Sequence, residues 1–77
     1  MVSLLLAMTC AQQIQFAEIV MTARQADLPA SDVVGIMLVG DEKRLTEAAY
    51  SLPVMHRSRD KSRAIKNFTE SVRDNCK

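Results

Sequence analysis

The stretch "VMTARQADLPASDVVGIM", residues 20–37, carries the signals that decide the fold. Pro29 predicts the end of one helix, because the residue that precedes a proline is pushed out of the α region. Ser31 is suited to cap a second helix, and Asp32 then lies in the first turn, where the helix dipole favours negative charge. The run that follows, residues 33–39, is apolar on nearly every side and predicts a short buried helix. The stretch therefore indicates two helices joined by a short break.

A first helix is predicted upstream of this break, from near Ser3 to about Ala26. Apolar residues recur there with the three- and four-residue spacing that places side chains on one face of a helix. Polar residues fall mostly on the other side, so we expect this helix to be amphipathic. Its expected buried face contains Cys10, Ile14, Ala17 and Met21, and it is widened by Phe16, Ile19, Val20 and Ala23.

Two more helices are predicted downstream. The third starts at Asp41, a good N-cap residue, and is ended by Pro53. A loop follows, and the fourth helix starts at about Ser58. The expected apolar residues are Leu45, Ala48, Ala49 and Leu52 on the third helix, and Ala64, Ile65, Phe68, Val72 and Cys76 on the fourth. The sequence therefore predicts an all-α fold, a small bundle of about four helices with short connections.

Length and composition agree with this prediction. The chain has 77 residues, enough for a single domain over 1–77, and 48% of them are hydrophobic. Two glycines and two prolines are too few for a fold built on many tight β turns. A chain this short buries only about 60% of its unfolded surface, so its margin of stability is thin. Such domains often add a disulfide, a metal or a partner subunit to the core.

The two cysteines offer one such addition. Cys10 lies early on the apolar face of the first helix, and Cys76 lies at the end of the stripe of the fourth. If these helices pack antiparallel, the two sulfurs can meet, and the bridge would stabilise the fold by roughly 4 kcal/mol on the chain-entropy account. A disulfide implies an oxidising compartment. The alternative is a pair of reduced thiols in the core of a cytosolic protein.

The N-terminus allows two interpretations. The apolar run over residues 4–8 is far too short to span a bilayer, which takes about 20 residues. Small residues such as Ala7 and Thr9 are typical of the positions before a signal-peptide cleavage point, yet no positive charge precedes Arg24. Residues 1–9 are therefore either the remnant of a secretory leader or the first turns of the first helix.

Positive charge gathers in the C-terminal segment. Up to Pro53 acidic residues outnumber basic ones, and after it the balance is reversed. This asymmetry predicts either a surface that attracts an anionic partner or one solvated helix face. Nucleic acid is a less favoured partner, because no aromatic residue is interleaved with the cluster and the net charge is only +1. The cluster consists of Arg57, Arg59, Lys61, Arg63 and Lys66.

Catalytic and metal-binding motifs do not emerge from the sequence. A zinc site needs about four ligands, and the chain offers one histidine, His56, with two distant cysteines. The two glycines are not arranged as a phosphate-binding loop. No spacing pairs a nucleophile with a base. We therefore expect no enzyme activity, no metal and no cofactor.

Several short motifs occur in a recognisable order. They are Cys10, residues 17–21 (AEIVM), residues 23–25 (ARQ), residues 31–34 (SDVV), Ala49 with Tyr50, Pro53, Ala64 with Ile65, Phe68, and Cys76 with Lys77. The ordered set resembles a group of small exported proteins found in phages, prophages and Gram-negative bacteria. The resemblance covers nearly everything from Cys10 to Lys77 and implies a helical, disulfide-closed, exported domain. It implies no activity.

The chain departs from that group at two places. Ala26 and Asp27 stand where the group tends to have a glycine, and residues 55–61 are basic where its members are more polar and acidic. The polar pair Arg24 and Gln25 belongs to the shared pattern, but helix packing alone does not require it. We therefore count this pair with the basic cluster as candidate partner-binding residues.

Three hypotheses of function follow. The first is a non-enzymatic interaction protein of phage or prophage type, periplasmic or secreted, that binds a protein in the bacterial envelope. The second is a cytoplasmic phage-type inhibitor of a host protein, a dimer that docks through its apolar helix or its basic segment. The third, less favoured, is nucleic-acid binding.

Overall fold

A computed structural model of the protein describes residues 8–29 and 40–76, and these residues form three helices and no strand. The helices are α1 (Cys10–Gln25), α3 (Gly40–Tyr50) and α4 (Ser58–Asn75). The all-α prediction is confirmed, whereas the described residues hold three helices where about four were predicted for the whole chain. The buried helix predicted over residues 33–39 lies outside the described residues.

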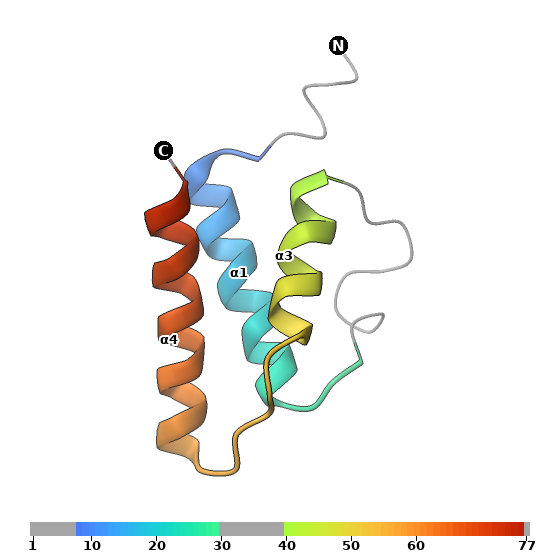
Figure 1. The fold of residues 1–77 in the computed structure, drawn as a ribbon, viewed down its shortest axis with the longest axis vertical. Helices are drawn as coiled ribbons and strands as arrows, with labels where there is room; N and C mark the ends of the chain where they lie inside the picture. The colour runs from blue at the N-terminus through green and yellow to red at the C-terminus, as the bar shows by residue number, and fades with distance from the viewer. Residues whose placement is uncertain (1–7, 30–39, 77) are drawn as a thin grey trace.

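Helix α1 is the central element, and both α3 and α4 pack against it (Figure 1). Helix α3 runs in the same direction as α1, and α4 runs antiparallel to it. The predicted antiparallel arrangement of the first and last helices is therefore confirmed. It places the beginning of α1 beside the end of α4.

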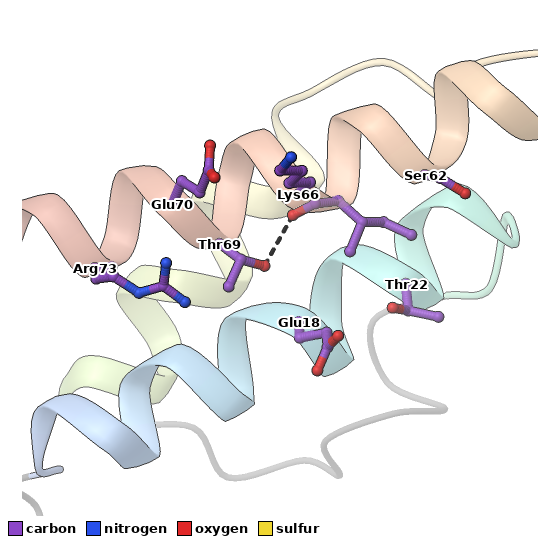
Figure 2. Close-up of a pocket in the computed structure, with 8 residues that line it drawn as sticks. Glu18, Thr22, Ser62, Lys66, Thr69, Glu70 and Arg73 are labelled. Atoms are coloured by element: carbon purple, nitrogen blue, oxygen red, sulfur yellow. Dashed lines mark hydrogen bonds between the residues drawn. The ribbon is translucent and has the colours of Figure 1, made fainter.

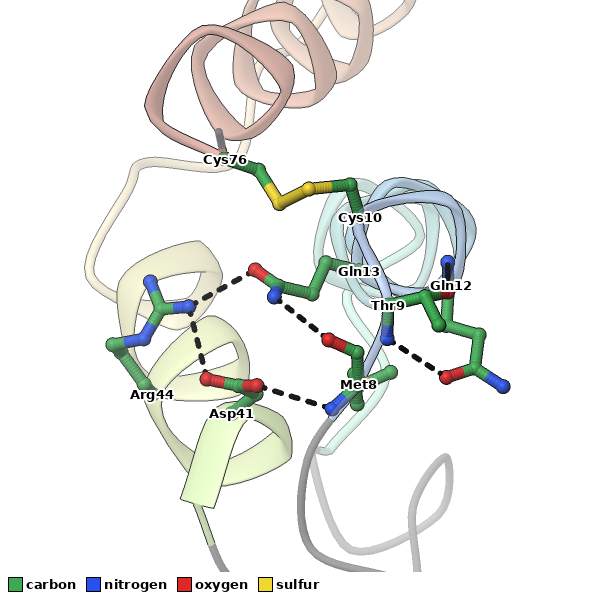
Figure 3. Close-up of a disulfide and its surroundings, with 8 residues drawn as sticks. All are labelled: Met8, Thr9, Cys10, Gln12, Gln13, Asp41, Arg44 and Cys76. Atoms are coloured by element: carbon green, nitrogen blue, oxygen red, sulfur yellow. Dashed lines mark hydrogen bonds and ion pairs between the residues drawn. A yellow bond between two sulfur atoms is a disulfide. The ribbon is translucent and has the colours of Figure 1, made fainter. Parts of the chain in front are cut away.

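The beginning of α1 corrects the sequence-based prediction. Met8 and Thr9 are not helical, so no continuous helix extends from Ser3 to Ala26. The reason is a capping box around Thr9 (Figure 3). Its hydroxyl accepts a hydrogen bond from the backbone N–H of Gln12 at 3.1 Å, and its own N–H donates to Oε1 of Gln12 at 3.0 Å. These bonds satisfy backbone donors that a helix start would otherwise leave free, so the helix begins at Cys10.

The end of α1 is fixed by its own backbone rather than by proline alone. The N–H of Leu28 donates to the carbonyl of Ala23, and that of Asp27 donates to the carbonyl of Arg24, each at 3.0 Å. Asp27 has φ of 62°, the left-handed conformation that this type of helix end requires. The turn therefore closes although the chain lacks a glycine there.

The core lies along the inner face of α1. Three residues predicted to lie on buried faces are exposed instead: Ile19 is 55% exposed, and Cys10 and Ala48 are exposed as well. Ile19 is two positions from both Ala17 and Met21, which turns it by about 200° from them on a helix, to the outer face. The buried apolar residues among those described are Ala17, Val20, Met21, Ala23, Leu45, Ala49 and Val72.

A disulfide joins the two ends of the described fold, as predicted. The sulfurs of Cys10 and Cys76 are 2.03 Å apart, and the two Cα atoms are separated by 5.7 Å (Figure 3). Cys76 is the C-cap residue of α4 rather than part of its stripe. The bridge spans a sequence separation of 66 residues, so it closes almost the whole chain.

Candidate interaction site

The pair Arg24 and Gln25 lies inside the molecule, at the point where the end of α1 meets the segment between α3 and α4. The side chain of Gln25 is only 2% exposed. Its Nε2 donates to the carbonyl of Pro53 at 2.9 Å, and its Oε1 accepts from the backbone N–H of Met55 at 2.8 Å. A partner protein therefore has no access to this amide, and Gln25 is better explained as an internal clamp.

Arg24 contributes to the same clamp. Its Nε donates to the carbonyl of Leu52 at 2.8 Å, and its guanidinium carbon lies 5.4 Å from the centroid of the Tyr50 ring. The Tyr50 hydroxyl in turn donates to the carbonyl of Leu28 at 2.7 Å. These contacts tie the end of α3 to the turn after α1. The pair Arg24 and Gln25 therefore holds the end of α1 against the segment between α3 and α4.

The basic cluster divides into two parts. Lys61 points inward, and its Nζ donates to the carbonyl of Gln25, one of the last carbonyls of α1. Arg57 is the exposed N-cap residue of α4 and makes no side-chain capping bond. The other members lie on the outer face of the helix. The sequence predicted all of these residues as one set, because it does not show which α4 positions face α1.

The outer face of α4 is exposed and mainly basic. Its residues follow a spacing of three and four, which places them on one side of the helix. Within the described part of the chain the one ion pair joins Arg44 and Asp41 at 3.3 Å, so no arginine or lysine of α4 forms an ion pair there. We name this surface the α4 basic face; it consists of Arg59, Arg63, Lys66 and Arg73, with Glu70 among them.

A first groove lies between α1 and α4, with a volume of about 490 Å³ (Figure 2). Glu18 and Thr22 come from α1, and Lys66 and Arg73 come from α4. Charges of both signs and hydroxyl groups line it, and it is open to solvent. It extends the α4 basic face toward α1.

A second groove, here named the α3–α4 groove, has a volume of about 510 Å³ and a mainly apolar lining. Met21 and Phe68 lie among its lining residues, with Leu52 and Met55 from the segment between the helices. The sequence predicted Ala48 as a core residue. In the structure Ala48 lines this groove instead, because α3 and α4 both pack on α1 and leave space between them.

Other kinds of site find little support in the described part of the chain. No group of three or more His, Cys, Asp or Glu side chains is placed to hold a metal ion there. His56 is exposed in the segment before α4. Among residues 8–29 and 40–76, no helix combines the length and the apolar character that crossing a membrane requires.

No protein family matches the chain, and no curated protein or solved structure is significantly similar to it.

Proposed function

We propose that this chain is a non-enzymatic protein-interaction module that works in an oxidising compartment and binds a protein of the bacterial envelope. The observation that carries the proposal is the disulfide between Cys10 and Cys76, which joins the two ends of the fold. Such bridges persist outside the cytosol, in the periplasm or among secreted proteins. The resemblance to exported phage and prophage proteins supports the same location and a phage-related role.

The α4 basic face is the proposed contact surface. Its bases are exposed and unpaired among the described residues, so they retain their full attraction for an acidic surface. Packing does not need them: the side of α4 that packs on α1 carries residues such as Phe68 and Val72. A surface that the fold does not use for its own stability is available for a partner.

One observation favours the alternative, a dimeric cytoplasmic inhibitor. Ile19 is 55% exposed on the outer face of α1, where charged residues are few, and a second copy would bury it. The disulfide weighs against a cytosolic location. Nucleic-acid binding would use the same bases, but Glu70 interrupts their row with negative charge.

Site-specific photo-crosslinking in the native host tests the proposal. A photo-reactive residue at Arg63 should give an adduct with a protein of the envelope fraction, and the same residue at Gln15, exposed on α1, serves as the control. The proposal fails if Arg63 gives only cytosolic adducts, only a crosslinked dimer, or no adduct beyond that of the control. Retention on DNA that falls steeply with salt would favour the nucleic-acid alternative.

A further inference from the structure

We infer that the α3–α4 groove binds an amphipathic helix of the partner protein, one whose apolar face is flanked by acidic residues. This inference rests on the proposed function and specifies the partner's binding element. It is carried by the shape, the lining and the charge of the groove.

The groove is elongated along α4. Its main part and a smaller hollow of about 200 Å³ share Ala48, Phe68 and Ser71 as lining residues, so the two adjoin. Met55 and Asp60 lie toward one end, and Asn75 lies at the other. At 1.5 Å per residue, the stretch of α4 from Asp60 to Asn75 is about 22 Å long. A helix of about four turns matches that length.

The lining suits a helix that packs closely. Small side chains, Ala48, Ser51 and Ser71, line the groove together with the apolar Leu52 and Phe68. Small residues at a helix contact allow interaxial distances near the short end of the usual range of about 8–10 Å. A bound helix would therefore pack between α3 and α4 as an additional member of the bundle.

Other occupants fit less well. A β-strand binds by extending the exposed edge of a sheet, whereas α3 and α4 satisfy their backbone groups within the helices and offer no such edge. The described helices of a second copy are also poor occupants. The outer face of α4 is charged, and Ile19 is the one large apolar residue that is strongly exposed on the outer face of α1.

An exposed arginine near each end of the groove, with one aspartate beside it, favours acidic flanks on the partner. Arg63 lies near one end and makes no ion pair among the described residues, although Asp60 lies there too. Arg44 lies near the other end, with its side chain 60% exposed, and shares its charge with Asp41. The α4 basic face adjoins the groove through Arg63. Acidic residues beside an apolar stripe would meet these bases without desolvating them.

Binding of designed peptides to the full chain, with its disulfide intact, tests the inference. The probes are three fluorescein-labelled peptides of about four turns: one with leucines at i, i+3, i+4 and i+7 and glutamates beside them, one with lysines in place of the glutamates, and a scrambled form of the first. We expect the acidic amphipathic peptide to bind, and the other two to bind at least about tenfold more weakly. Fluorescence anisotropy measures the affinities.

Two matched variants locate the site. Ser71 lines the α3–α4 groove and Ser62 lines the groove between α1 and α4, and both are exposed serines on α4. Ser71→Trp should fill the α3–α4 groove and weaken peptide binding by at least about tenfold, whereas Ser62→Trp should change it less than about twofold. Circular dichroism of both variants checks that the fold persists. Should Ser71→Trp misfold, the uncharged Ser71→Gln at the same exposed position replaces it and should also weaken peptide binding.

Three outcomes overturn the inference. The acidic peptide binds the Ser71→Trp variant as tightly as the unchanged protein, or all three peptides bind equally well. In the third, a second copy of the chain occupies the groove at micromolar concentration in place of the peptide. These failures differ from a failure of the proposed function. An envelope adduct at Arg63 without peptide binding would leave the proposed function standing and remove the groove as its site. Peptide binding without an envelope adduct would leave the groove as a helix-binding site and remove the proposed function.

Discussion

The side chain of Gln25 shows how one buried amide organises the end of the molecule. It bonds the carbonyl of Pro53 and the N–H of Met55, and its backbone carbonyl accepts from Lys61. A buried polar group is tolerated when its partners are present and costly when one is removed. Gln25 therefore holds the segment between α3 and α4 in place, which in turn positions the start of α4.

Replacement of Gln25 by methionine keeps its approximate volume and removes both side-chain hydrogen bonds. We expect Gln25→Met to lower the free energy of unfolding by about 1–2 kcal/mol, because two partly buried backbone groups lose their partners. Gln15→Met, at an exposed position on α1, should change it by no more than about 0.5 kcal/mol. Urea unfolding under non-reducing conditions measures both. Equal effects of the two substitutions would contradict the clamp.

Asp27 occupies a left-handed conformation, with φ of 62°, at the end of α1. Glycine reaches this conformation without a steric penalty, whereas alanine lacks the local hydrogen bonding that helps aspartate tolerate it. We expect Asp27→Gly to raise the free energy of unfolding by about 0.5 kcal/mol and Asp27→Ala to lower it by about 1 kcal/mol. Thermal unfolding orders the three proteins, and an alanine variant more stable than the glycine variant would refute this account.

At the scale of the element, one side of α4 packs on α1 and the other side is exposed for binding. The side that faces α1 carries Phe68, Val72 and Lys61, whose ammonium group bonds the end of α1. The outer side carries the α4 basic face. The two lysines of the helix, Lys61 and Lys66, therefore provide a matched comparison between stability and binding.

We expect Lys61→Ala to lower the free energy of unfolding by about 1–2 kcal/mol, because the α1 carbonyl loses a charged donor. Lys66→Ala should leave stability within about 0.5 kcal/mol and reduce the photo-crosslink to the envelope partner. Urea unfolding and crosslinking, done on both variants, measure the two effects. Exchanged roles for the two lysines would show that the division of α4 is wrong.

The sequence predicted some of these elements because their signals are local. The apolar stripes of α1 and α4 follow from spacing, and α4 starts at Ser58 as predicted, although no side chain caps it. The pair Thr9 and Gln12 also has the spacing of a capping box, so the correct start of α1 was available from sequence. The pairing of Gln25 with Pro53 and Met55 was not, because it depends on loop geometry about thirty residues away.

The candidate site illustrates the same limit. The basic cluster was visible as composition, but only packing separates inward Lys61 from outward Lys66. The α3–α4 groove exists because α3 and α4 pack on α1 and leave space between them. The spacing that put Ala48 on an apolar face does not tell whether that face meets another helix. A helix face that lines an apolar groove and a helix face that lies in the core therefore have the same sequence pattern.

At the scale of the whole molecule, the disulfide compensates for a small core. It spans a sequence separation of 66 residues, for which the chain-entropy account gives a stabilisation of about 4 kcal/mol. Domains of this size have little stability to lose. The bridge also joins α1 to α4, the helix that bears the α4 basic face.

Removal of the bridge should therefore destabilise the fold as a whole. We expect the Cys10→Ser, Cys76→Ser double variant to lose about 4 kcal/mol of unfolding free energy and to be largely unfolded at 37 °C. Circular dichroism during urea titration, with the oxidised protein as reference, measures the loss. A double variant that unfolds at the same urea concentration as the oxidised protein would contradict a stabilising role.

The central claim is that this disulfide exists in the compartment where the protein works. The most direct test is to block thiols in living cells of the native host, purify the protein without reductant, and measure its intact mass. The account predicts that neither Cys10 nor Cys76 carries the blocking group, and that both become reactive only after reduction. Protein with both cysteines blocked before any reduction would contradict the account and favour the cytosolic alternative.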